Sequence, residues 1–254
     1  WIVGAMNLLL VMVVYTLTRL FFYWINIDLY QNVSTGHLIE MLIGGLRFDL
    51  TALLYINSLY LLLVLLPLPA TIRSHKAYMG VAKWTFWIPN IIGFIANCMD
   101  IVYVRFTNRR TTCTIFSEFQ NDDNIIQVIL QSALQYWHVT VFGIVILIIF
   151  ILCTGKKWEV RTPRRIWAYY LLETLIMLAS VYFIVIGIRG GFGKYTRPIT
   201  ISNALQYTNT PQETAIILNT PFSLMKSLEN TTYIHPHYFR KEEVESIFTP
   251  IHND

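Results

Sequence analysis

Apolar residues gather in five blocks along the chain, and the stretches between them carry most of the charge. Each block has roughly the 17 to 25 residues that a helix needs to cross the hydrocarbon core of a bilayer. None shows the alternating pattern of an outer-membrane barrel strand. The pattern therefore predicts an all-α polytopic membrane protein with five transmembrane helices. The blocks are Ile2 to Trp24, Leu50 to Leu66, Trp84 to Val104, Trp137 to Cys153 and Ile166 to Ile188.

Two stretches beside the blocks have a helical pattern but are too short or too polar to span. Leu38 to Leu46 leads into the second block, and Asn124 to Gln135 leads into the fourth. In the latter, Val128 and Ile129 lie on one helical face, and glutamines lie on another. We expect both stretches to be interfacial helices.

Lysine and arginine in the loops indicate the orientation, because cytoplasmic loops are enriched in these residues. The loops after the second and fourth blocks hold eight, against four in the loops after the first and third. This difference places the N-terminus in the cytoplasm and the C-terminus outside. Arg189, Lys194 and Arg197, close to the last block, argue for the opposite orientation. The eight are Arg73, Lys76, Lys83, Lys156, Lys157, Arg161, Arg164 and Arg165, and the four are Arg47, Arg105, Arg109 and Arg110.

The chain after the last block has mixed polarity and recurring helix starts. Thr210-Pro211-Gln212-Glu213 combines an N-cap threonine, a first-turn proline and a glutamate three residues after the cap. Thr220-Pro221 repeats the Thr-Pro start, and Arg240 to Phe248 forms a third short helical pattern. We therefore divide the chain into a five-helix transmembrane domain, 1–190, and an extracytoplasmic juxtamembrane linker, 191–254, whose helices lie on the bundle or on the membrane surface.

Composition and motifs limit the kinds of binding and catalysis that this chain can carry out. The chain is 55% hydrophobic and 13% charged, with a net charge of +4, whereas about a quarter of the residues of a soluble domain are charged. Basic residues beside apolar blocks indicate topology and lipid-headgroup contact, not nucleic-acid binding. The cysteines have no metal-ligand spacing, and no catalytic motif is present. His235-Pro236-His237 lacks further ligands and is interpreted as a solvated turn rather than a metal site. The sequence thus predicts no catalytic residue and no metal ligand.

Ionisable groups inside the blocks are costly, about 2.5 kcal/mol or more each, so they need a partner or a role. The polar residues inside or beside the blocks that we predict to have a structural role are Asp49, Asn97, Asp100 and Glu173. We expect Arg47 or Arg105 to pair with Asp100 or Asp49; the alternative is that these are snorkelling charges at the interface. Glu173 is interpreted as a paired or neutralised acid, with a proton relay as the alternative.

Three arginines in "VRFTNRRTT", residues 104 to 112, follow the third block. If the helix continues outward, Arg105 and Arg109 share a face near threonine hydroxyls, a donor set that suits phosphate. In Arg189-Gly190-Gly191, glycine amides are candidates for approaching an anion; a helix C-cap is the alternative. Ordinary headgroup contact is the alternative for the arginines. The predicted lipid-headgroup or substrate-binding set is Arg47, Arg105, Arg109, Arg110, Arg189 and Arg197.

Several ordered blocks resemble the N-terminal membrane part of bacterial sulfatase-family proteins of the lipoteichoic acid synthase type, with Bacteroides-like members the most similar. The likeness extends over nearly the whole chain and rests on these blocks: "GLRFDLTALLYIN" (Gly45 to Asn57), "RFTNRRTT" (Arg105 to Thr112), "GIRGGF" (Gly187 to Phe192), "RPITISNA" (Arg197 to Ala204), "ETAIILNTPFSL" (Glu213 to Leu224) and "IFTPIH" (Ile247 to His252).

The resemblance implies five spans in the bacterial cytoplasmic (inner) membrane, followed by an extracytoplasmic catalytic domain of alkaline-phosphatase type. That domain would hold a threonine nucleophile and a divalent metal (Mn, Mg or Zn). It would transfer phosphoglycerol or phosphoethanolamine from a phospholipid to an envelope acceptor. No position here matches the nucleophile or metal motif, so no catalytic residue or cofactor is expected in this chain. The partners implied are membrane phospholipid and the chain's own C-terminal catalytic domain.

Three other functions remain open at this stage. The parent protein could be a membrane-anchored sulfatase or phosphatase with the same architecture. A non-catalytic scaffold is a second alternative. A transporter is a third, favoured by the polar residues inside the spans. The odd number of spans, the lack of an internal repeat and the scarcity of helix-breaking signals apart from Pro89 count against the transporter.

Overall fold

The structure is a computed structural model that describes residues 1–119, 125–154, 165–191 and 197–228. Within these ranges it is helical and contains no strand. Four helices are long and apolar enough to cross a membrane, and the bent pair α2 (Thr35–Ile56) and α3 (Ser58–Leu65) makes a fifth span if it is counted as one. The predicted all-α polytopic membrane fold is thus confirmed. The four are α1 (Ile2–Ile25), α5 (Lys76–Thr107), α8 (Trp137–Thr154) and α9 (Ile166–Arg189).

The second span differs from its prediction. Leu38 to Leu46 is not a separate interfacial helix, because α2 runs without interruption from Thr35, capped by Ser34, to Ile56. The chain then bends by 67° into α3. The polar pair Asn57-Ser58 lies at this bend. Pro89, the helix-breaking signal noted in the sequence, instead lies inside α5 without ending it.

A pair of buried amides stabilises the bend. Asn57 Nδ2 donates to Asn90 Oδ1 at 3.3 Å, and Asn90 Nδ2 donates to Asn57 Oδ1 at 2.7 Å. Asn57 Nδ2 also donates to Leu53 O in the last turn of α2. Both amides are fully buried, so this reciprocal bonding offsets their desolvation and ties the bend to α5.

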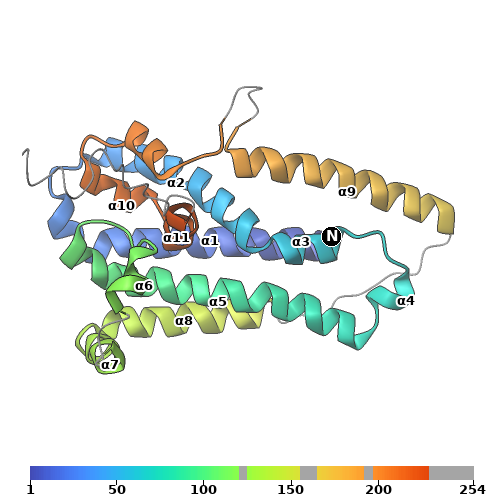
Figure 1. The fold of residues 1–254 in the computed structure, drawn as a ribbon, viewed down its shortest axis with the longest axis horizontal. Helices are drawn as coiled ribbons and strands as arrows, with labels where there is room; N and C mark the ends of the chain where they lie inside the picture. The colour runs from blue at the N-terminus through green and yellow to red at the C-terminus, as the bar shows by residue number, and fades with distance from the viewer. Residues whose placement is uncertain (120–124, 155–164, 192–196, 229–254) are drawn as a thin grey trace, which may run out of the picture.

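Helix α9 lies along α2 and α3, apart from α5 and α8 (Figure 1). At one end Gly187 lets the backbones approach: a Cβ there would lie 2.4 Å from Leu54 Cδ1. Thr51 Oγ1 donates to Gly187 O at 3.1 Å. At the other end Arg73 Nη1 donates to Glu173 Oε1 at 3.0 Å. Glu173 is therefore a paired acid, as predicted from the cost of burying it.

Short elements complete the described chain. Helix α7 agrees with the helix predicted over Asn124 to Gln135, although Asn124 itself lies outside the described residues. The third helical pattern, Arg240 to Phe248, also lies outside the described residues. The short elements are η1 (Ile27–Tyr30), α4 (Ala70–Arg73), α6 (Thr114–Phe119), α7 (Ile125–Gln135), η2 (Ile201–Tyr207), η3 (Pro211–Glu213), α10 (Thr214–Ile217) and α11 (Thr220–Leu228).

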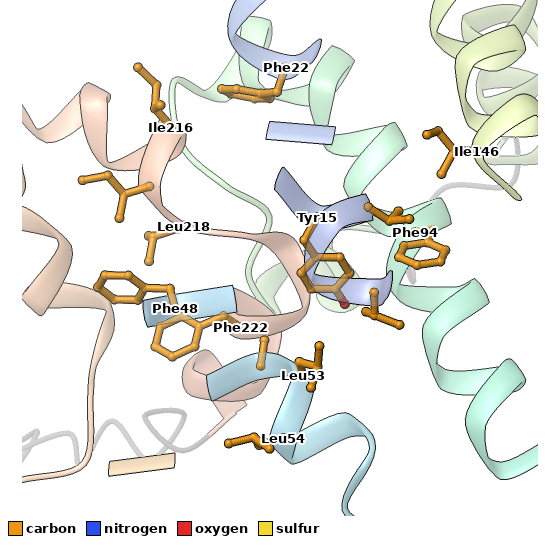
Figure 2. Close-up of a cluster of buried hydrophobic side chains, with 14 of the residues drawn as sticks. Tyr15, Phe22, Phe48, Leu53, Leu54, Phe94, Ile146, Ile216, Leu218 and Phe222 are labelled. Atoms are coloured by element: carbon orange, nitrogen blue, oxygen red, sulfur yellow. The ribbon is translucent and has the colours of Figure 1, made fainter. Parts of the chain in front are cut away.

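Residues 197–228, which we call the post-span segment, pack into the end of the bundle. Every residue from Ala215 to Ser223 is buried. Phe222 meets Phe48 of α2 edge to face at 5.1 Å, and Figure 2 shows both rings on the same side of the core as Leu218. Of the two places predicted for the linker helices, the bundle and the membrane surface, this stretch takes the first. It packs so closely against α1, α2 and α5 that it forms part of the core.

Candidate functional site

A buried ion pair joins α1 and α2 beneath the post-span segment. Arg19 is 3% exposed and Asp49 is fully buried. Arg19 Nη1 donates to Asp49 Oδ2 at 2.6 Å and Nη2 donates to Oδ1 at 2.5 Å, which is the bidentate geometry of a strong charge-assisted contact. Gly45 permits this position, since a Cβ there would lie 2.5 Å from Arg19 Cζ.

Arg19 also donates to three backbone carbonyls, Gly45 O of α2 at 3.2 Å and two carbonyls of the post-span segment. Nε donates to Ile216 O at 2.9 Å, and Nη2 donates to Ile217 O at 2.8 Å. Asn219 Nδ2 donates to Asp49 Oδ1 at 2.7 Å. The ion pair thus fixes both the carbonyls and a side chain of a segment about two hundred residues away in the sequence.

Asp100 of α5 is the centre of a second cluster. Arg110 Nη1 donates to its Oδ2 at 3.3 Å, and Thr220 Oγ1 donates to the same oxygen at 2.8 Å. Thr111 donates to Oδ1 through its amide at 3.0 Å and its hydroxyl at 2.5 Å. Asn97 Oδ1 accepts from Thr220 N at 3.0 Å. Asp100 therefore accepts hydrogen bonds from two segments, residues 110–111 and the post-span segment.

The expected pairing partners were wrong for both aspartates. Asp49 pairs with Arg19 and Asp100 pairs with Arg110, whereas neither Arg47 nor Arg105 reaches them. Arg105 instead donates to Ile25 O at 2.6 Å and to Asp28 at 3.0 Å. Sequence reasoning missed Arg19, although an arginine inside the first apolar block was itself a signal that a buried anion was needed.

Arg105, Arg109 and Arg110 do not lie on one continuous helix. Helix α5 ends at Thr107, and Asn108 adopts φ 55°, a left-handed conformation that turns the chain back. Arg110 consequently points inward: it is 5% exposed, donates from Nε to Ala215 O and lies over the Phe22 ring at 3.9 Å. Arg110 thus stabilises the bundle and is not accessible to a headgroup, contrary to its prediction.

Other members of the predicted headgroup set remain at the surface. Arg109, Arg189 and Arg197 are exposed, and Arg105 is 31% exposed. A role for these four in contacting phospholipid headgroups stays a prediction.

The glycines after α9 form a C-cap, so the hypothesis that their amides bind an anion was wrong. Gly190 N and Gly191 N both donate to Ile186 O, at 2.9 and 3.2 Å. Gly190 has φ +77°, a conformation that favours glycine. Its missing Cβ also leaves room for Arg47, because a Cβ there would lie 2.9 Å from Arg47 Nε.

Arg47 borders a groove of about 560 Å³ between α2 and α9. Its Nε is buried and has no hydrogen-bond partner in the structure. The other residues lining the groove are apolar or glycine: Met12, Leu46, Leu50, Leu54, Phe183, Ile184, Ile186, Gly187, Gly190 and Gly191.

The predicted helix starts in the post-span segment are only partly correct. Thr210 and Glu213 form the predicted capping box. At the next start the cap is Asn219, whose Oδ1 accepts from Phe222 N at 2.8 Å, because the Thr220 hydroxyl donates to Asp100.

Glu213 connects this segment to α2. Its Oε2 accepts from Asn209 N at 2.7 Å and lies 3.2 Å from His37 Nε2. Burial opposes ionisation of this carboxyl, but the hydrogen bonds from Asn209, His37 and Thr210 outweigh it. The pKa of Glu213 is therefore lowered from its ordinary value.

This lowered pKa predicts how acid affects the segment. The stabilising contribution of Glu213 is complete above the ordinary glutamate pKa, about 4.3, and is lost as the pH falls through the lower pKa of the folded state. We expect the difference in unfolding free energy between the wild type and Glu213→Gln to be largest near neutral pH and to shrink below about pH 4. A constant difference across this range would contradict the role given to the carboxylate.

Across the described ranges, no three His, Cys, Asp or Glu side chains are arranged to hold a metal ion. His235-Pro236-His237 lies outside these ranges. In comparisons with family models, curated proteins and solved structures, nothing matches the chain.

Proposed function

We propose that this chain is the membrane-embedded, lipid-facing part of a phospho-group transferase of the inner membrane. The parent would move phosphoglycerol or phosphoethanolamine from a phospholipid to an envelope acceptor. A metal-dependent catalytic domain outside the membrane, following residue 254, would carry the chemistry. The sequence resemblance supports the type of reaction. The polar clusters around Asp49 and Asp100 support the role of the membrane part, which is to hold the catalytic domain in place.

One observation supports the proposal above the others. Three of the sequence blocks that carry the resemblance meet around these two aspartates, although they lie far apart in the chain. The first block supplies Asp49, the second supplies Arg110 and Thr111, and the third supplies Asn219 and Thr220. These residues fix the post-span segment, as far as Leu228, to the bundle, so a domain attached beyond it would be held near a defined part of the bundle.

A fixed exit suits a transferase that acts on a lipid. The scissile bond of a phospholipid lies at the headgroup level, so the catalytic groups must be held at that height. Holding reactants in the correct geometry can supply a large part of a rate enhancement. A mobile tether would lose that advantage for a lipid substrate, whereas a soluble substrate would still diffuse into the catalytic cleft.

A transporter remains the second candidate because α2 and α3 form a broken span, a feature of many secondary transporters. The polar groups at this break are Asn57 and Asn90, and they bond to each other. They are therefore occupied in stabilising the bend, which favours the transferase. A sulfatase or phosphatase parent would share the whole membrane architecture and would differ in its substrate.

The function can be tested with Thr220→Ala in the full-length parent protein. This change removes one hydrogen bond to a buried carboxylate, which is typically about 1.5–3 kcal/mol. We expect the rate of transfer from phospholipid to fall about tenfold, because the post-span segment is held less firmly. Hydrolysis of a soluble chromogenic phosphodiester should be unchanged.

Thr214→Ala is the matched control, since the Thr214 hydroxyl donates to Pro211 O at an exposed position and does not touch Asp100. It should leave both activities intact. Equal loss on both substrates in Thr220→Ala would contradict the positioning role. A wild-type parent that turns over sulfate esters but transfers no phospho-group from phospholipid would establish the hydrolase instead.

A further inference from the structure

Arg47 belongs to the predicted headgroup set and borders a groove of the described structure. The groove lies between α2 and α9, and its walls include Met12, Leu50, Leu54 and Phe183. Among the described residues, no acidic side chain forms an ion pair with Arg47. Its Nε is buried and donates to nothing.

Arg47 as a whole is only partly buried, but it differs from the two buried arginines because no acidic side chain among the described residues pairs with it. Arg19 and Arg110 each have an aspartate and at least one backbone carbonyl as partners. A buried donor without a partner loses the hydrogen bond that it would make in water, and a charged donor loses more. An anion held beside Arg47 would accept the hydrogen bond that this Nε does not make.

The shape of the groove indicates what carries that anion. Its volume, about 560 Å³, falls within the roughly 300–1,000 Å³ of known ligand sites. Leu50 and Phe183 are 41% and 60% exposed, so in the bilayer these walls face lipid. A peptide there would expose unpaired backbone groups to hydrocarbon. An acyl chain has no such groups.

We propose that this groove holds one membrane phospholipid, with its phosphodiester against Arg47 and one acyl chain along the walls formed by α2 and α9. Arg47 makes the groove select phospholipids over lipids without a phosphate. The acyl chain adds little, because it gains little by leaving other lipid tails for an apolar wall. That the bound lipid is the donor substrate rests on the proposed function.

Gly190 links the site to the post-span segment. Arg47 lies directly under this C-cap residue, and Ile199 of the post-span segment approaches the same point, with Cβ 3.4 Å from a Cβ built on Gly190. A lipid phosphate at Arg47 would therefore lie where the chain leaves the last span, below the segment that leads toward the proposed catalytic domain.

The test measures phospholipid retained by the purified full-length parent in detergent, by native mass spectrometry. The probes are phosphatidylglycerol, phosphatidylethanolamine and a diacylglycerol with the same acyl chains. We expect Arg47→Gln to retain at least about tenfold less of either phospholipid, the effect of losing a charged hydrogen bond. Arg47→Lys should retain an intermediate amount. Diacylglycerol, which lacks the phosphate, should be retained weakly by every variant.

A second variant tests the groove without changing its charge. Leu50→Trp places a larger side chain in the wall and should also lower phospholipid retention. The controls are Arg165→Gln, an exposed arginine outside both the groove and the predicted headgroup set, and Leu59→Trp, an exposed leucine on α3. Both should bind as the wild type does. Thermal unfolding of each variant shows whether it is folded.

Two results separate the inference from the proposed function. Wild-type retention by folded Arg47→Gln and Leu50→Trp, or equal retention of diacylglycerol and phospholipid by the wild type, would overturn the inference. Loss of binding in both variants, in a parent that transfers nothing from phospholipid, would support the lipid site and contradict the proposed function.

Discussion

Replacing Arg19 with alanine is expected to destabilise the protein by about 3–5 kcal/mol, the usual cost of removing one partner from a buried ion pair. Asp49 would remain fully buried with only the Asn219 amide as a side-chain donor. The carbonyls of Ile216 and Ile217 would each lose a hydrogen bond from the guanidinium. The measurement is the free energy of unfolding in detergent micelles, together with protease cleavage within the post-span segment.

Two further variants show whether the cost comes from the uncompensated charge. Arg19→Met with Asp49→Leu should be clearly more stable than either single change, because apolar residues of similar volume often replace a buried pair at little cost. Arg197→Ala, at an exposed arginine of the same segment, should change stability by about 0.5 kcal/mol or less. If Arg19→Ala changed the free energy of unfolding no more than Arg197→Ala does, the ion pair would not hold the post-span segment in place.

The second large effect is expected at Asp100. Asp100→Ala would leave Arg110 buried without its anion and would remove the acceptor of Thr111 and Thr220. We expect a loss of about 3–5 kcal/mol and release of the post-span segment from α5. The same unfolding and proteolysis measurements apply.

A double-mutant cycle identifies the partner of Asp100. Because Asp100 and Arg110 are in contact, their coupling energy should be about 1–3 kcal/mol, whereas residues without shared contacts are nearly additive. The cycle between Asp100 and Arg47 should therefore give a coupling close to zero. A coupling with Arg47 as large as that with Arg110 would restore the pairing expected from sequence and contradict the arrangement described here.

The cluster at Asp100 also shows why the sequence could not predict the separate positions of the three arginines in "VRFTNRRTT". The three arginines are equivalent in the sequence, yet Arg105 bonds to the end of α1, Arg109 is exposed and Arg110 is buried. Asn108, in the left-handed conformation, ends α5 between Arg105 and the other two arginines, so they do not share a helical face. A single backbone dihedral is set by the packing around it, so the apolar pattern of the span could not indicate where Arg110 would point.

The apolar pattern alone determined the class of protein and the extent of three spans, whereas α5 begins at Lys76, before the predicted Trp84. Block boundaries fell within a few residues of the ends of α1, α8 and α9, because crossing a bilayer is a property of local hydrophobicity and length. The expectation that Glu173 needs a partner also came from a local property, the cost of a charge in hydrocarbon.

Tertiary structure decided which partners meet. Arg73 and Glu173 are 100 residues apart, and Arg19 reaches Ile217 across 198; no pattern along the chain selects such pairs. The bend at Asn57 and the burial of Ala215 to Ser223 have the same origin. Hydrophobicity acts on each residue separately, whereas ion pairs, amide pairs and close backbone contacts depend on distances that exist only after the helices have packed.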